Sequence, residues 1–562
     1  IAAIAIIALV IFLKLVAVSV KLKSELARLE VLLSINREEI SVLNGHYNHR
    51  PNGAQLQPAH HPYSQDLDVF GHASLFQYLH RTTSEQSAQL LANWLLQPAD
   101  KETILARQQA AKELRDQSEW RQELQARGHL NPLSYSTQHS LAAWLSQPAG
   151  FANTAWKIAR FILPAISLTL LVLYTFDLIL PGYFWLGVLI FFAVSGYISK
   201  LATPQYVQLS KHITQLETLS KTLQWIENAS FTSPLLTQLK HSLNTNIENA
   251  NADNAQRIRN PKHQTRNLPS QHVKSLKRIL DRMDYRLNPL VFVPLNIFLF
   301  WDLQQVLQLE KWKAQQQNKI DHWFEAIAEA EAISSLANLS FNHPSWVFPV
   351  IRPEWFALKC EQAGHPLIPP AKCVPNSIGM NGHPQLAFIT GSNMAGKSTF
   401  LRTIGINLVM AMAGAPVCGA YFESPVLRVM TSMRIADNLE ESASTFYAEL
   451  QKLKMILDAV KTNSKEVFLL LDEILRGTNS LDRHTGSEAL IKQLIKEKAV
   501  GMIASHDLSL AELEQQYPGI IHNYHFDVTI EGNELHFDYK LKQGVCKTLN
   551  ATLLMKKIGI EM

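Results

Sequence analysis

Residues 391–398 read Gly-Ser-Asn-Met-Ala-Gly-Lys-Ser, and this stretch decides the fold of the C-terminal part of the chain. It matches GxxxxGK[ST] and stands between an apolar run, LAFIT, and a segment of helical character, FLRTIGINLVM, as a strand–loop–helix phosphate site requires. Glycines let backbone N–H groups close around phosphate oxygens, and the helix N-terminus adds its dipole. Lys397 would supply positive charge to the β- and γ-phosphates, and the Ser398 hydroxyl would coordinate Mg²⁺. We predict a nucleotide site formed by Gly391, Ser392, Asn393, Met394, Ala395, Gly396, Lys397, Ser398 and Thr399.

A second apolar strand, residues 467–473, ends in two carboxylates, Asp472 and Glu473. We predict that Asp472 helps to hold Mg²⁺ and that Glu473 orients or deprotonates the attacking water, as hydrolysis of a nucleotide requires. A third strand, GMIAS, leads to His506, which we expect to sense the γ-phosphate. A lone histidine is as often a plain surface residue, and the position of His506 after the preceding strand favours the functional interpretation.

Four segments carry a family resemblance: TGSNMAGKSTFLRT at 390–403, SASTFYAEL at 442–450, LLLDEILRGTNSLD at 469–482 and ASHDLSL at 504–510. They are similar, in order and spacing, to TGPNMxGKSTFLR, STFMxEM, LLDEIGRGTSTxD and ATHxxEL of the MutS family of mismatch-repair ATPases. The resemblance covers residues 384–562 and extends more weakly to 68–98 and 326–340.

The resemblance implies a dimer of ATPase heads with composite ATP sites, using ATP and Mg²⁺ and producing ADP and phosphate. Ser444 would reach the γ-phosphate bound to the partner subunit, and His506 would be the switch histidine. The polar turn from Thr478 to Asp482 would cross the dimer interface, and residues 544–562 would form the helix-turn-helix that clasps the partner. DNA is the ligand that the family resemblance implies.

The chain also departs from the family pattern. Residues 1–65, which precede the core-like segment, are too few for the family's mismatch-reading and connector domains. The phenylalanine expected to stack on adenine is replaced near Cys373-Val374, and Tyr539 is the candidate to take its place. These departures argue against specific recognition of mismatches.

Three apolar runs indicate membrane helices. Residues 1–20 hold one charge, Lys14, and a helix of this length spans about 30 Å, the thickness of a bilayer core. A cleaved signal peptide would need a basic segment before the apolar run and a small-residue cleavage site after it, and neither is visible in this sequence. The runs 161–180 and 183–199 contain only Asp177 as a charge and meet at Pro181-Gly182, so we predict a transmembrane hairpin rather than two buried core helices.

Basic residues flank these runs on one side: Lys21, Lys23, Lys157, Arg160 and Lys200. The positive-inside tendency predicts a multi-pass protein of the cytoplasmic (inner) membrane, with its large polar segments in the cytoplasm. The chain begins at Ile1 rather than Met, and we expect it to lack its true start.

One basic concentration lies within residues 257–286. It could contact DNA phosphates or anionic lipid headgroups, and a merely solvated face is the alternative. The candidate residues are Arg257, Arg259, Lys262, Arg266, Lys274, Lys277 and Arg278.

Composition sets outer limits on function. The 52 basic and 48 acidic residues give a net charge of +4, so no global positive field indicates nucleic acid. The 4 cysteines include no CxxC pair, which argues against zinc and against a disulfide framework, and nothing suggests haem. The His-rich loop at 44–65 has no cysteine or acidic partners to complete a metal site.

We therefore predict a mixed fold, an α-helical core and lever with transmembrane helices plus a C-terminal α/β P-loop NTPase head of the ABC type. The expected segments are a transmembrane helix (1–20), a helix and loop (22–65), a first core part (66–158), the transmembrane hairpin (159–200), a second core and lever part (201–345), a linker (346–383) and the ATPase with its dimerisation segment (384–562). The expected function is a membrane-tethered, dimeric, DNA-binding ATPase. The alternatives are a transporter-type ATPase, which should carry an LSGGQ-like signature where this chain has SASTF, and a nucleotide-switched membrane scaffold without DNA binding.

Overall fold

The computed structural model describes residues 2–151, 153–244, 268–317, 319–352, 357–392, 395–434, 445–531 and 534–546. The chain divides into two compact units, each assembled from separate stretches of sequence. The helical unit consists of Ile1–Ile35, Thr82–Ala88 and Glu119–Ala332, and the α/β unit of Asn36–Arg81, Gln89–Ser118 and Ile333–Met562.

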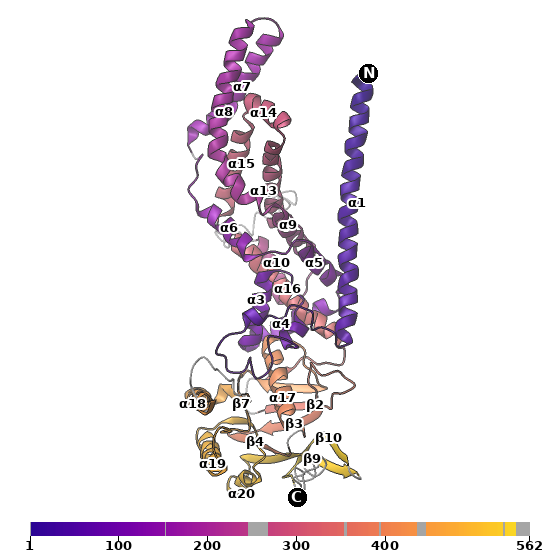
Figure 1. Cartoon of the computed structure of the whole chain (residues 1–562), viewed down its shortest axis with the longest axis vertical. Helices are drawn as coiled ribbons and strands as arrows, with labels where there is room; N and C mark the ends of the chain where they lie inside the picture. Colours follow the sequence, from indigo (N-terminus) through magenta and orange to yellow (C-terminus); the bar gives the residue numbers. More distant parts are fainter. Residues whose placement is uncertain are drawn as a thin grey trace. The chain divides into compact units, whose positions relative to one another are not determined.

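Helices make up the helical unit throughout its described residues (Figure 1). An apolar core lies where several of them meet, and within it Trp144 and Trp312 stack with 5.8 Å between ring centroids. The helices are the N-terminal part of α1 (Ala2–Leu43), α5 (Ser118–Leu130), α6 (Tyr135–Ser146), α7 (Thr154–Thr175), α8 (Pro181–Ser210), α9 (Ile213–Asn228), α10 (Pro234–Asn244), α13 (Pro269–Met283), η2 (Asp284–Leu287), α14 (Pro289–Leu299), α15 (Trp301–Gln316) and the first part of α16 (Ile320–Asn342).

Helices α7 and α8 form a hairpin (Figure 1). Most of its apolar side chains are exposed or only partly buried. In the described part of the chain α7 and α8 are the two helices long and apolar enough to cross a membrane, and only 6% and 17% of their apolar windows are buried. The break between them falls at residues 176–180, slightly before the predicted turn, and Pro181 is the first residue of α8. Proline is favoured at this position because the first N–H groups of a helix have no partner within it.

The membrane helix predicted for residues 1–20 lies within α1, which continues without a break to Leu43. Its apolar side chains, such as Ile11 and Phe12, are exposed. Arg28 of α1 forms an ion pair of 2.6 Å with Glu123 of α5. The membrane role of residues 1–20 stays a prediction.

The sequence interpretation missed α14, an apolar helix of 11 residues inside the predicted second core part. It is joined to α15 by a bend of 78° at Phe300. Only the two helices together are long and apolar enough to span a membrane. Pro289 and Pro294 obscured α14 in the sequence, since prolines usually mark helix ends.

The α/β unit contains a six-stranded sheet of order β10-β9-β4-β8-β7-β6. Five strands are parallel, and β10 is antiparallel to β9. Every residue of β4, β7 and β8 is buried, as in a parallel sheet covered on both faces. The strands are β4 (Gln385–Thr390), β6 (Arg428–Ser432), β7 (Val467–Asp472), β8 (Val500–Ala504), β9 (Ile521–Glu531) and β10 (Glu534–Gln543).

The helices of this unit are α2 (Leu75–Leu79), α3 (Glu85–Leu96), α4 (Lys101–Arg115), α17 (Lys397–Ala413), α18 (Thr445–Asn463), α19 (Ser480–Lys496) and α20 (Leu513–Gln516), with the ends of α1 and α16 and the short 3-10 helices η1 (Ala54–Leu56), η3 (Ser464–Glu466) and η4 (Leu508–Glu512). The first residues of α3 belong to the helical unit. Helix α19 takes in part of the predicted polar turn at 478–482, because the side chain of Asn479 caps it by accepting a hydrogen bond from the N–H of Asp482.

Residues 346–383 carry three strands where the sequence predicted a linker. These are β1 (Val350–Arg352), β2 (Ala357–Ala363) and β3 (Asn376–Asn381), and with β5 (Tyr421–Pro425) they form a sheet of order β1-β5-β2-β3. The sequence did not show this sheet because β5, which pairs with both β1 and β2, comes from the far side of the glycine-rich loop.

Candidate functional site

The glycine-rich loop joins the end of β4 to the start of α17. Gly391 and Gly396 have φ angles of 145° and 105°, which favour glycine, and a Cβ atom on Gly391 would lie 2.9 Å from the carbonyl oxygen of Phe526. Lys397 opens α17, and its Nζ donates hydrogen bonds to the carbonyl oxygens of Gly391 and Ser392 at 2.8 and 3.1 Å. Burial lowers the pKa of Lys397. The lysine side chain therefore folds back over the loop that is predicted to bind phosphate.

The two predicted magnesium ligands, Ser398 and Asp472, lie together. Asp472 ends the buried strand β7, and its Oδ1 atom has no hydrogen-bond partner. Burial raises the pKa of Asp472, and a hydrogen bond with Ser398 opposes this shift. A carboxylate oxygen without a partner beside a hydroxyl group fits Mg²⁺, which prefers oxygen ligands and completes its shell with phosphate oxygens.

Glu473 occupies the centre of a group of cationic or titratable side chains. Its carboxylate oxygens lie 4.0 Å from Nζ of Lys397, 3.3 Å from Nε of Arg476 and 3.6 Å from Nδ1 of His506. The φ of Glu473 is 48°, in the left-handed region that non-glycine residues seldom adopt and that is enriched at active sites. The structure thus brings Lys397, Glu473 and His506 together at the ends of three neighbouring parallel strands, β4, β7 and β8.

The sequence interpretation missed Glu449, although it lies in the quoted segment 442–450. Its carboxylate is 5% exposed and accepts a hydrogen bond of 2.5 Å from the N–H of Leu475, just after Glu473. Burial raises the pKa of Glu449. This buried acid holds the backbone of the loop that carries the candidate base.

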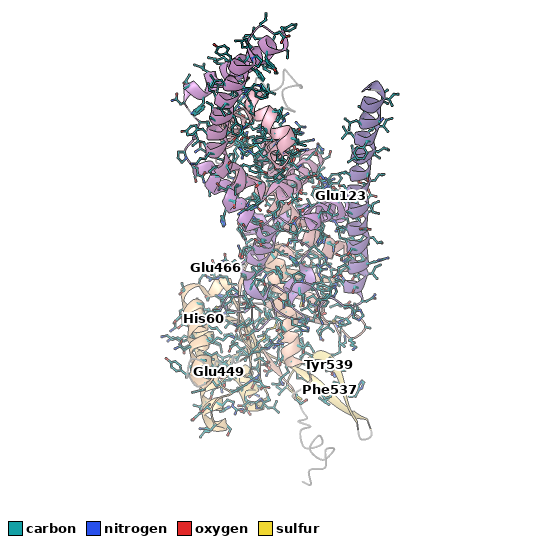
Figure 2. All side chains as sticks on the ribbon, turned by 45° about the horizontal axis from the view of Figure 1, so that its top comes forward. His60, Glu123, Glu449, Glu466, Phe537 and Tyr539 are labelled. Atoms are coloured by element: carbon teal, nitrogen blue, oxygen red, sulfur yellow. The ribbon has the colours of Figure 1, made fainter. Side chains whose placement is uncertain are left out.

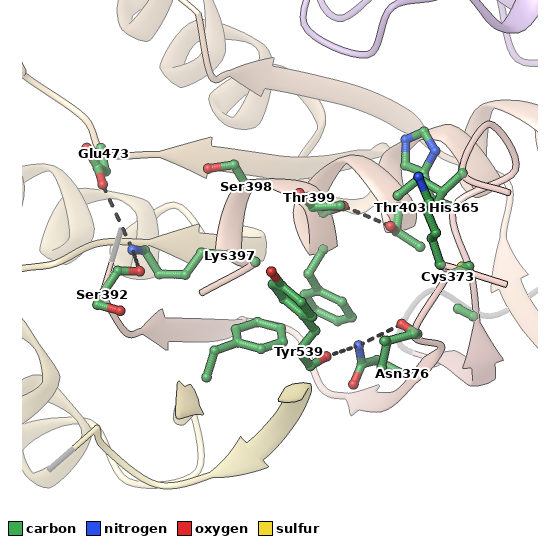
Figure 3. A pocket seen from close by; sticks show the side chains of 17 residues that line it. His365, Cys373, Asn376, Ser392, Lys397, Ser398, Thr399, Thr403, Glu473 and Tyr539 are labelled. Carbon is green, nitrogen blue, oxygen red and sulfur yellow. Dashed lines mark hydrogen bonds and ion pairs between the residues drawn. The ribbon is translucent and has the colours of Figure 1, made fainter. Parts of the chain in front are cut away.

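A pocket of about 530 Å³ lies beside the glycine-rich loop, a size typical of small-molecule sites. Figure 3 shows Lys397 and Glu473 at one end, His365 and Cys373 at the other, and Tyr539 between them. Burial lowers the pKa of His365 to about 4, so it is neutral near pH 7. The pocket thus offers charged groups to phosphates at one end and weakly polar groups to a nucleotide base at the other.

Tyr539, the candidate adenine contact, stands on an irregularity of β10. The register between β9 and β10 shifts between Phe537 and Leu541, and Tyr539 has a φ of 53°. Asn376 holds this bulge, because its Nδ2 donates to the carbonyl oxygen of Tyr539 at 3.0 Å and its Oδ1 accepts from the N–H of Leu541 at 2.8 Å. Phe537 stacks on the Tyr539 ring with 5.9 Å between centroids, and Figure 2 shows the two side by side.

Some predicted site residues fall elsewhere. Asn393, Met394, Ser444, Arg257, Arg259, Lys262 and Arg266 lie outside the described residues, as does 547–562 of the predicted dimerisation segment. Lys274, Lys277 and Arg278 lie on α13 in the helical unit, where Lys274 and Arg278 are exposed and Lys277 pairs with Glu217 and Asp281. The last three residues therefore form part of a charged helix face. Their binding to DNA or lipid stays a prediction.

A second buried carboxylate connects early and late parts of the α/β unit. Asp66, which is 1% exposed, accepts hydrogen bonds from the hydroxyl of Thr431 at 2.5 Å and from the N–H of Met433, and it pairs with Lys452 at 2.6 Å. Asp66 gave no signal in the sequence because its partners lie more than 360 residues later. Its partners lie on β6 and α18, which both pack against β7, the strand that ends at Asp472.

Comparison with known proteins gives the same family for this domain. A family model described as MutS domain V matches residues 387–557, which include the glycine-rich loop, both carboxylates and His506. The C-terminal part of the chain is therefore similar to domain V of the MutS family. The DNA mismatch repair protein MutS of Thermotoga maritima is 32% identical over 241 residues, which cover 42% of this chain and 29% of that protein.

Other MutS relatives match to a similar extent. The DNA mismatch repair protein MutS of Aquifex pyrophilus is 34% identical over 39% of this chain and 26% of its own length. The human MutS protein homolog 4 is 31% identical over 39% of this chain and 24% of its own length. The matches thus span less than a third of these MutS proteins.

Proposed function

We propose that this chain binds ATP and hydrolyses it to ADP and phosphate in a Mg²⁺-dependent reaction. The observation that carries the proposal is the convergence of Lys397, Glu473 and His506 beside a pocket of about 530 Å³, with the unpartnered Asp472 oxygen next to Ser398. Similarity to domain V of the MutS family supports the same activity.

We infer a distinct task for each side chain. Lys397 exchanges its contacts with the loop carbonyls for the β- and γ-phosphates. Ser398 and Asp472 hold Mg²⁺, which neutralises phosphate charge when bound. Glu473 accepts a proton from, or orients, the attacking water, and Arg476 fixes the carboxylate at 3.3 Å.

His506 lies beside the same carboxylate and can report the state of the γ-phosphate to it. Tyr539 stacks on the adenine from its bulge, since an aromatic face suits a planar base. Ser444 of one subunit completes the site of the other in a homodimer joined through the ATPase heads.

We propose further that the protein is a multi-pass protein of the cytoplasmic membrane, with its α/β unit in the cytoplasm. The exposed apolar faces of α7 and α8 support insertion, because water-exposed helices of this composition would cost folding free energy. Arg160 and Lys200 at the open end of the hairpin set its orientation. DNA is the proposed ligand by family, and a nucleotide-switched scaffold for a membrane protein is the alternative that the hairpin favours.

The Glu473→Gln variant tests the ATPase assignment. It should bind ATP as tightly as the unmodified protein and lose most of its phosphate release, since general-base catalysis contributes about 100- to 10,000-fold. Fluorescent ATP binding and phosphate release would be measured side by side on detergent-solubilised protein. Equal turnover in the two proteins would exclude Glu473 as the base.

A binding measurement tests the DNA proposal. Matched, mismatched and branched duplexes would be compared with and without ATP, at two stated salt concentrations, because phosphate contacts make affinity salt-dependent. Nucleotide-sensitive binding is the expected result. An ATPase that binds none of the duplexes at low salt would contradict the DNA role and favour the membrane scaffold.

A further inference from the structure

Helix α14 is an apolar element whose exposed face has no protein partner within the described helical unit. Its sequence, PLVFVPLNIFL, has one polar residue, Asn296, and that side chain is buried against Ser199 of α8. The exposed residues are apolar, and Leu290 is the extreme case with 88% of its surface exposed. Its other side packs against α7 and α8, the proposed membrane hairpin.

The two ends of α14 return to one place. Arg286, before the helix, pairs with Asp302, after it, at 2.8 Å, and Trp301 Nε1 donates to the carbonyl oxygen of Arg282 at 2.8 Å. The rings of Tyr285 and Trp301 stack at 5.7 Å. Helices α13 and α15, on either side of the segment, also pack on each other in the apolar core that contains Trp144 and Trp312. A transmembrane span would place its ends about 30 Å apart, so these contacts exclude a full crossing.

Contacts with the hairpin give the depth of the segment. At its ends, Arg286 donates to the hydroxyl of Thr203 at 3.3 Å, and Asp302 accepts from Ser199. At its bend, Phe300 packs on Phe191 with 5.9 Å between ring centroids. Phe191 precedes Ser199 by two turns of α8, about 12 Å along the helix. The side chains of Phe300 and Asp302 reach these two points from backbone positions only two residues apart, so the bend lies close to the ends of the segment and well short of the middle of a bilayer core of about 30 Å.

The backbone at the bend is satisfied from within the protein, as a lipid environment requires. Asn288 caps the start of α14 by accepting from the N–H of Leu290 at 3.2 Å. The hydroxyl of Ser167 donates to the carbonyl oxygen of Phe298 at 2.6 Å, and Asn296 accepts from the N–H of Asp302 at 3.1 Å. These three side chains thus pair with backbone groups that lipid acyl chains could not satisfy.

We propose that α14 is a re-entrant membrane segment, which enters and leaves one leaflet on the side of Arg160 and Lys200 and is covered there by lipid acyl chains. Tyr285, Trp301 and Arg286 lie at its mouth, and aromatic and basic residues of this kind are enriched at the membrane–water interface. The proposal rests on the proposed membrane insertion of the hairpin. It adds a third contact with the bilayer, placed directly between two core helices, α13 and α15.

Photocrosslinking to lipid tests this proposal in the full chain. Benzoylphenylalanine would replace Leu290 or Val293 on α14, Leu186 on α8 as a positive control and Leu481 on α19 as a negative control; all four side chains are exposed. The variants would be reconstituted in phosphatidylethanolamine–phosphatidylglycerol vesicles that contain radiolabelled phosphatidylcholine. We expect crosslinks at Leu290, Val293 and Leu186, and none at Leu481.

A second measurement needs no substitution. Lys274 and Lys311, on α13 and α15, are both exposed, and an amine reagent that cannot cross membranes should modify both from the same side of sealed, uniformly oriented vesicles. Modification from opposite sides would overturn the re-entrant path in favour of a span. Crosslinks at Leu186 without any at Leu290 and Val293 would overturn the inference alone, whereas none at Leu186 would overturn the proposed hairpin as well.

Discussion

Strand β7 and helix α7 are both strongly apolar, yet they end in opposite surroundings. All six residues of β7 are buried, whereas Ser167 is the one buried residue of α7 among its 22. In the α/β unit, neighbouring strands and helices remove the apolar side chains from water. In the hairpin α14 covers only part of the apolar surface, and the rest would be covered by lipid in the proposed membrane setting. Apolar composition therefore predicts that a segment will be shielded from water. Whether protein or lipid shields it depends on the elements that pack against it.

The polar residues of the two regions differ in the same way. In the α/β unit, the buried Lys397 lines the pocket, and the buried Asp472 contacts Ser398, which also lines it. In the helical unit, Asp302 is fully buried, and its carboxylate oxygens accept hydrogen bonds from Arg286 and Ser199. We infer that Lys397 and Asp472 serve ligand binding, whereas Asp302 stabilises the contact of α8 with the residues on either side of α14. Three substitutions test this contrast.

The largest effect is expected for Asp302→Ala. Removing one partner of a buried ion pair leaves the other uncompensated and costs about 3–5 kcal/mol. Thermal unfolding of the detergent-solubilised protein should show a large loss of stability, while ATP affinity, measured below the transition, should be kept. Asp281→Ala, which removes a half-exposed ion pair with Lys277, is the matched control and should cost less than about 1 kcal/mol. Equal destabilisation by the two variants would contradict a structural role for the buried pair.

The next largest effect is expected for Lys397→Ala, which should weaken ATP binding and leave stability nearly unchanged. Charge-assisted hydrogen bonds contribute about 1.5–3 kcal/mol each, so losing the contacts with phosphate should weaken ATP binding about 100-fold. Equilibrium titration with fluorescent ATP measures this, and thermal unfolding should change little. Lys372→Ala, at the exposed far end of the same pocket, is the control. Unchanged ATP affinity in Lys397→Ala would place the phosphates elsewhere.

The smallest effect is expected for Asn376→Ala, which frees the bulge that carries Tyr539. Loss of a neutral hydrogen bond costs about 1 kcal/mol, so the KM for ATP should rise about fivefold with kcat nearly constant. Tyr539→Ala should reproduce this change, and Tyr539→Phe should not, because the ring is kept. A fall in kcat at constant KM would show that the bulge acts on the chemical step instead of on adenine binding.

Sequence alone predicted the strand–loop–helix around Lys397 and the strand that ends at Asp472, and the structure contains both elements. The glycine-rich loop and the strand ending at Asp472 and Glu473 are local patterns, and parallel strands bring their carboxyl ends to one edge. It did not predict Asn376 as the support of Tyr539, because the two are 163 residues apart and meet only through a bulge. It also could not predict the left-handed backbone at Glu473, which depends on long-range support from residues such as Glu449.

The limits were similar for the fold. The hairpin was visible because each of its helices is one uninterrupted apolar run. Helix α14 was not, because 11 residues are too few for a span and two prolines divide the run. The strands in 346–383 were hidden because their shared partner, β5, follows the glycine-rich loop by sequence.

The interleaved make-up of the two units has a consequence for synthesis of the chain. Asp66 is synthesised long before its partners Thr431 and Lys452. Likewise, Thr83 and Ser84 precede Glu331, whose carboxylate accepts hydrogen bonds from their N–H groups at 3.0 and 3.1 Å. The ribosome delivers α7 and α8 before either set of partners exists, so on the proposed topology the hairpin enters the bilayer while both units are still open. Expression of residues 387–557 alone would omit Asn36–Arg81 and Gln89–Ser118, which belong to the same compact unit. The borders of the family domain are thus not the borders of the compact unit that contains it.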